Sequence, residues 1–158
     1  MSDETLADES LILVFSGKWH ALWMLRQVFA AIDEAACKAQ SRKAAGKVPE
    51  RSDISADHMT TLMETFCEIG RHKLPKTNFV LEDLPTTNRI YAFKRDQLRV
   101  YGAFVEPSDH PRTFLCTAID PGKKRNQPNK AIIARADRLM SDHLDLIRAR
   151  LVPSDMQE

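Results

Sequence analysis

Residues 88–104 read NRIYAFKRDQLRVYGAF, and this stretch decides the fold that the sequence predicts. Two runs rich in β-branched and aromatic residues, Ile90–Lys94 and Leu98–Phe104, are separated only by Arg95-Asp96-Gln97. Two such runs joined by a short polar break predict a β-hairpin. A third run, Thr113–Ile119, follows a proline-containing loop and extends the hairpin to an antiparallel meander.

The segments outside the meander predict supporting elements. Leu11–Phe15 is a short apolar run, which indicates a buried strand. Apolar residues recur every three or four positions over Trp19–Gln40 and again over Ser55–Ile69, so we predict two helices there, the second ending at Gly70. A closing helix is predicted over 128–151.

This order of elements predicts an α+β fold. An N-terminal strand and two helices would pack on a small antiparallel sheet, with a closing C-terminal helix, one face of the sheet covered and the other open. The chain has 158 residues, which suits one domain. We place that domain at 10–151, between a disordered acidic N-terminus at 1–9 and a tail at 152–158.

Several classes of protein do not fit the composition. The longest apolar run is too short to span a bilayer, and the acidic start is unlike a signal peptide, so we expect a cytoplasmic protein with no membrane partner. The cysteines Cys37, Cys67 and Cys116 lie far apart and form no zinc-type pair. We therefore expect no metal and no cofactor, and we interpret Cys67 and Cys116 as buried free thiols.

The net charge of +1 hides an uneven distribution of charge. Residues 1–85 contain 10 Lys/Arg against 13 Asp/Glu, whereas residues 86–150 contain 13 against 7. A local excess of positive charge attracts polyanions, although a solvated basic face with no partner is an equally good interpretation from charge alone. Cations and aromatic residues alternate in and after the meander, and the candidate RNA-contacting residues are Arg89, Lys94, Arg95, Arg99, Tyr101, Lys123, Lys124, Arg125 and Lys130.

Four other residues are considered as candidates for function. Trp19 and Trp23 lie one helical turn apart and could stack bases, but we favour core packing for both. His72 follows the second predicted helix and is interpreted as a surface residue. His110 lies in the loop before the third strand, where we favour a solvated side chain over a catalytic one.

Two segments, RIYAFKRDQLRVY and AIDPGKKRNQPNKAIIARA, together resemble the RelE/ParE superfamily of bacterial toxins, most closely its HigB-like, phage-derived branch. The resemblance covers roughly residues 60–140. It implies a compact α+β fold and ribosome-dependent cleavage of mRNA, held off by an antitoxin protein. Cleavage in such enzymes needs no metal, because the ribose 2′-hydroxyl attacks the adjacent phosphate while cations stabilise the developing charge.

The resemblance also assigns roles to residues of this chain. Arg99, Lys124 and Lys94 match the catalytic cations by motif position. Family members often place a tyrosine or histidine near the last helix as acid or base, whereas this chain has Asn129 and Lys130 there. The alternative is therefore a non-nuclease member of the same fold, either a ParE-like topoisomerase inhibitor or an inactive phage-derived accessory protein.

Overall fold

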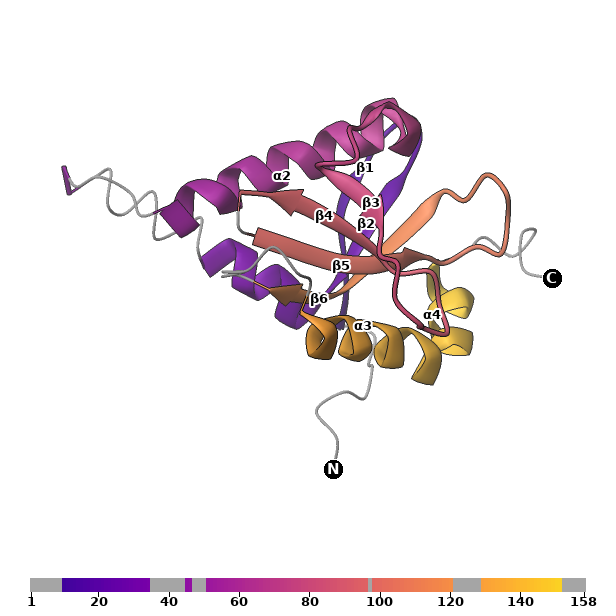
Figure 1. Cartoon of the computed structure of the whole chain (residues 1–158). Helices are drawn as coiled ribbons and strands as arrows, with labels where there is room; N and C mark the ends of the chain where they lie inside the picture. The colour runs from indigo at the N-terminus through magenta and orange to yellow at the C-terminus, as the bar shows by residue number, and fades with distance from the viewer. Residues whose placement is uncertain (1–9, 35–44, 47–50, 97, 121–128, 152–158) are drawn as a thin grey trace.

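The structure, a computed structural model, describes residues 10–34, 45–46, 51–96, 98–120 and 129–151. Within them, six strands form one sheet in the order β1-β2-β6-β5-β4-β3 (Figure 1). The strands are β1 Leu11–Ser16, β2 Ala21–Leu25, β3 Phe79–Leu81, β4 Tyr91–Arg95, β5 Leu98–Phe104 and β6 Thr113–Asp120. β2 pairs with β6 in parallel, and all other neighbouring strands are antiparallel.

Helices follow the N-terminal hairpin and the meander. Residues 26–34 are helical, and the other helices are α2 Arg51–Ile69, the short 3₁₀-helix η2 Arg71–Lys73, α3 Lys130–Asp142 and α4 Leu144–Leu151. The Asn129 side chain begins α3 as its N-cap, because its Oδ1 accepts the backbone N–H groups of Ala131 and Ile132. No helix in the described part of the chain is long and apolar enough to cross a membrane.

Helices pack on both faces of the sheet. Phe66 of α2 contacts Phe93 of β4 and Phe114 of β6, with ring centroids 4.9 and 5.7 Å apart. On the other face, the Thr117 hydroxyl of β6 donates to the Ala136 carbonyl of α3 at 3.1 Å (Figure 1). The α+β class is confirmed, but the sheet is mixed and larger than expected, and helices cover part of both faces.

The first predicted helix is wrong over Ala21–Leu25, which forms β2. Its burial alternates, since Leu22 and Met24 are buried while Ala21 and Trp23 are half-buried. Five residues with this pattern fit a strand and a helix about equally well. Pairing with β1 on one side and β6 on the other selects the strand, and helical structure begins only at residue 26.

The remaining predicted elements differ mainly at their ends. β1 and the three meander strands are confirmed to within one residue at each end. α2 begins at Arg51 rather than Ser55, and the closing helix is interrupted at His143, whose φ of −124° and ψ of 17° are not helical. Phe79–Leu81 forms the edge strand β3, which the sequence pattern did not predict. The predicted terminal segments 1–9 and 152–158 lie outside the described residues.

Candidate functional site

Three neighbouring cavities meet at Arg71, where β5 ends and β6 begins. Two of them, of about 500 and 520 Å³, also share Arg89 and Tyr91, and we call these two together the Arg71 groove. The third, of about 140 Å³, is lined by Trp19 and His20, and we call it the Trp19 pocket. The two larger volumes fall within the range usual for ligand sites.

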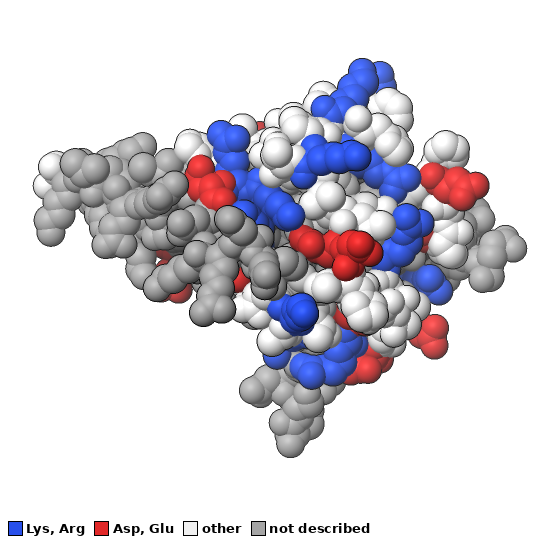
Figure 2. Space-filling model, viewed as in Figure 1, with Lys and Arg blue, Asp and Glu red and all other residues white. Residues whose placement is uncertain are grey.

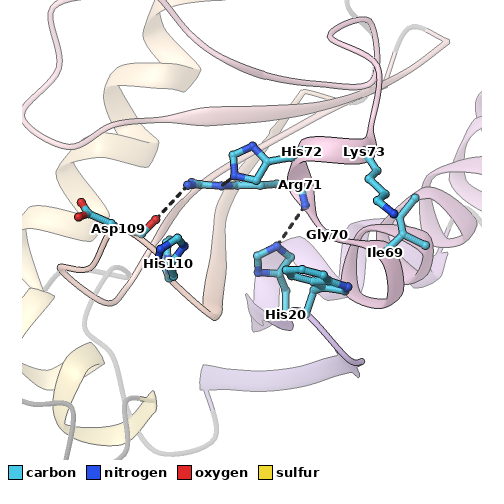
Figure 3. A pocket seen from close by; sticks show the side chains of 10 residues that line it. His20, Ile69, Gly70, Arg71, His72, Lys73, Asp109 and His110 are labelled. Carbon is cyan, nitrogen blue, oxygen red and sulfur yellow. Dashed lines mark hydrogen bonds between the residues drawn. The ribbon is translucent and has the colours of Figure 1, made fainter.

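Arg71 is fixed in place from several directions. Its backbone N–H donates to Nε2 of His20 at 3.2 Å, and its Nε donates to Nε2 of His72 at 3.2 Å. One Nη donates to the carbonyl of Asp109 at 3.5 Å (Figure 3). The guanidinium lies 4.9 Å from the ring centroid of Phe104. A guanidinium held in this way is positioned before any ligand binds, which lowers the entropic cost of binding.

The loop that contains Asp109 and His110 is anchored by a buried carboxylate. Glu106 is only 5% exposed, and its Oε1 accepts the backbone N–H groups of Arg112 and Thr113 at 3.1 and 2.6 Å. Its Oε2 accepts the Thr113 hydroxyl at 2.9 Å. Arg112 then donates to the carbonyls of residues 17 and 18, so the loop is tied to the β1–β2 turn beside the Trp19 pocket.

His20 forms the inner wall of the Trp19 pocket. It is 4% exposed and stacks on Phe66 with ring centroids 4.4 Å apart. Burial, assisted by the positive charges of Arg71 and Arg112, lowers the pKa of His20 to about 4. His20 is therefore neutral at physiological pH, and it serves as a hydrogen-bond acceptor for the backbone of Arg71.

The charge around these cavities is predominantly positive. In Figure 2, Lys and Arg side chains gather near the C-terminal end of α2 and over β3, with an acidic group lower on the same face. The Lys and Arg residues that line the three cavities are Arg71, Lys73, Lys76, Arg89 and Arg148. The acidic residues that line these cavities are Asp109 and Glu106. The Glu106 carboxylate already accepts hydrogen bonds from Thr113 in the loop that it anchors.

Three of the five predicted cations that the structure describes, Lys94, Arg95 and Arg99, lie at the opposite end of the sheet. Lys94 and Arg99 pair across β4 and β5 next to the turn, whereas Arg71 contacts Phe104 at the far end of β5. Lys94 forms an ion pair with Glu82 at 3.4 Å. One Nη of Arg99 donates to the carbonyls of residues 96 and 98 at 2.8 and 2.9 Å, so the side chain closes the turn between the strands.

The RNA-contacting residues predicted from the sequence have different surroundings. Tyr101 is fully buried, so no face of its ring is open to a base, and the stacking role predicted for it does not fit this structure. Arg95 and Lys130 are exposed, and Arg89 lines the Arg71 groove. Lys123, Lys124 and Arg125 lie outside the described residues.

Sequence reasoning missed the residues that the fold brings together here. Arg71 was not singled out. His72 and His110 are exposed, as predicted, but their position beside Arg71 was not predicted. A local signal exists in Gly70-Arg71-His72-Lys73, where three basic or titratable residues follow a helix stop. Trp19, expected in the core, is 52% exposed, whereas Trp23 is half-buried.

Among the described residues, no three His, Cys, Asp or Glu side chains are grouped as a metal site. The site instead offers fixed cations, histidines and exposed aromatic surface, which suit an anionic ligand with planar rings. Comparisons of the chain with family models, with curated proteins and with solved structures found no match.

Proposed function

We propose that this protein binds single-stranded RNA in the Arg71 groove and cleaves it. In this proposal it is a toxin of the HigB-like kind, which cuts mRNA at the ribosome in the cytoplasm and is inhibited by an antitoxin. The observation that supports RNA binding is the position of Arg71, a fixed guanidinium at the junction of three cavities bordered by four further cations. Cleavage is what the resemblance of the meander to RelE/ParE toxins implies.

The arrangement around Arg71 fits transesterification of a phosphodiester. His72 and His110 lie on either side of the Arg71 side chain in Figure 3. His110 would take the proton of the 2′-hydroxyl as its oxygen attacks phosphorus, and it would return that proton to the departing 5′-oxygen as the P–O bond breaks. His72, whose Nε2 accepts from Nε of Arg71, would hold the guanidinium in position. Arg71 would stabilise the charge on the phosphoryl oxygens. The products are a 2′,3′-cyclic phosphate and a 5′-hydroxyl.

The test is inducible expression in a bacterial host, with growth followed and transcript 5′ ends mapped. Wild-type protein is expected to arrest growth and to produce new 5′ ends inside coding regions. Arg71→Ala is expected to relieve both effects, and Arg26→Ala serves as control because this exposed arginine lines none of the three cavities. Normal growth with soluble, folded wild-type protein would contradict the toxin proposal.

One observation favours a second candidate function. In it, the protein resembles the same superfamily and binds a partner but does not cut RNA. Arg99 and Lys94, two of the three residues that match the catalytic cations, are engaged within the fold by turn carbonyls and by Glu82. In that case Arg71→Ala would still abolish binding, but transcripts would stay intact during growth arrest. DNA damage during the arrest would then indicate topoisomerase inhibition.

A further inference from the structure

The Trp19 pocket adjoins the Arg71 groove and differs from it in character. It is small, about 140 Å³, and its walls include the indole of Trp19, the His20 ring and Pro111. Arg71 and His72 line both the pocket and the groove, so the two recesses adjoin at these side chains. A small, ring-lined recess beside a cationic groove has the form of a base-binding subsite.

Trp19 is a preformed aromatic surface. Its backbone N–H donates to the carbonyl of Cys67 at 2.8 Å, which fixes the main chain against the end of α2. Its indole packs on Gly70, where an added Cβ would lie 3.2 Å from a ring carbon. With 52% of the residue still exposed, Trp19 retains free ring surface for a ligand to stack on.

The volume of the pocket limits the size of the ring it can hold. A cavity of about 150 Å³ in a protein interior accommodates benzene. The 140 Å³ of the Trp19 pocket therefore suits one six-membered ring, and the second ring of a purine would remain outside the pocket, toward solvent. Lys73, His72 and His110 at the lining supply donors for the carbonyl oxygens that every pyrimidine base presents.

We propose that the Trp19 pocket binds one pyrimidine base, stacked on Trp19, while the adjoining phosphate of the same nucleotide binds Arg71. This inference deepens the proposed function and rests on it: it adds a preference for pyrimidines at one position of the bound RNA. Arg71 supplies affinity for any phosphate, and the pocket supplies the discrimination between bases.

The chain reports on this pocket directly, because Trp19 and Trp23 are its two tryptophans. Trp23 lies in β2, paired with Leu13 and Leu115, and lines none of the three cavities. In Trp23→Phe, fluorescence comes from Trp19 alone, and in Trp19→Phe it comes from Trp23 alone. Circular dichroism checks that each variant is folded. If Trp23→Phe is unstable, the difference in quenching between wild-type protein and Trp19→Phe gives the contribution of Trp19 instead.

The probes are uridine 5′-monophosphate, adenosine 5′-monophosphate and ribose 5-phosphate. We expect the uridine nucleotide to quench Trp23→Phe and to leave Trp19→Phe unchanged. The adenosine nucleotide should need roughly tenfold higher concentration for the same quench, because the second ring of its base is not buried in the pocket. Ribose 5-phosphate should compete with the uridine nucleotide but cause little quenching itself.

Two results would overturn the proposal. Equal quenching by the two nucleotides would remove the size selection, and quenching of Trp19→Phe equal to that of Trp23→Phe would place the ligand elsewhere. Failure of the proposed function gives a different result. If RNA oligomers do not bind but the uridine nucleotide still quenches Trp19 selectively, the base-binding pocket is supported and RNA binding in the groove is contradicted. If RNA binds with no preference for pyrimidines and no change at Trp19, only the pocket assignment falls.

Discussion

The backbone N–H of Arg71 donates to Nε2 of His20, joining the first residue of η2 to the turn between β1 and β2. The two residues are 51 positions apart in sequence. Because Nε2 accepts this bond, the neutral ring must hold its proton on Nδ1, and a second proton cannot bind without breaking the bond. The position of the Arg71 backbone therefore depends on an uncharged His20.

This relationship predicts a pH-dependent stability. The pKa of His20 is lowered from 6.5 to about 4, so between these values the unfolded chain binds a proton that the folded chain does not. Stability from this group is full above pH 6.5 and decreases as the pH falls toward 4, by up to roughly 3 kcal/mol. His20→Gln retains an acceptor for Arg71 and should lose this component. Urea unfolding of both proteins at pH 4–7 measures it, and identical pH profiles would contradict the assignment.

Glu106 is expected to be important for stability as well as for the site. Glu106→Ala leaves the N–H groups of Arg112 and Thr113 and the Thr113 hydroxyl without their acceptor, at a cost of about 2–4 kcal/mol. Glu106→Gln keeps one carbonyl oxygen and should lose less. Denaturant unfolding gives both values. Wild-type stability for the alanine variant would show that the loop does not depend on this carboxylate.

Gly70 has a backbone conformation that other residues rarely adopt. Its φ of 91° and ψ of 154° lie in a region almost restricted to glycine, and Trp19 packs where a Cβ would stand. Gly70→Ala should therefore cost about 1–3 kcal/mol and shift the emission of Trp19. Thermal unfolding together with fluorescence of a Trp23→Phe background measures both. A stable variant with unchanged emission would be incompatible with this packing.

The buried cysteines should be unreactive in the folded protein. Burial raises the pKa of Cys67 to about 12 and raises that of Cys116 well above its usual range. Iodoacetamide at pH 8 should leave both thiols unmodified in the native protein and alkylate both in urea. Peptide mass spectrometry distinguishes the sites, and rapid native labelling of Cys116 would mean that the sheet opens far more readily than its packing indicates.

The sequence predicted elements whose pattern is local and missed those that depend on distant partners. The meander was predictable because Tyr91 and Phe93 alternate with small or polar residues beside a short polar turn. At that turn Asp96 adopts a φ of 55°, a conformation that aspartate tolerates better than most residues. The strand state of β2 is selected by its pairing with Phe114–Cys116, about 90 residues later in the chain.

The candidate site was harder to predict for the same reason. Its residues come from the β1–β2 turn, the end of α2, the start of β4 and the loop after β5, which only the folded sheet brings together. Cation content alone pointed to the opposite end of the sheet, where Lys94 and Arg99 are engaged with other groups of the fold. Arg89 is the one predicted RNA-contacting residue, among those described, that lines the Arg71 groove.

The central claim is that RNA phosphates bind at Arg71, and titration of a fluorescent single-stranded RNA oligomer over a series of salt concentrations tests it most directly. Wild-type protein should bind with an affinity that falls steeply with salt. Arg71→Ala should bind more weakly, with the slope of log K against log salt reduced by about 0.7, the contribution of one phosphate contact on a single strand. Arg26→Ala and Arg99→Ala should match wild type. If Arg71→Ala binds as tightly as wild type with the same slope, the groove is not the RNA site.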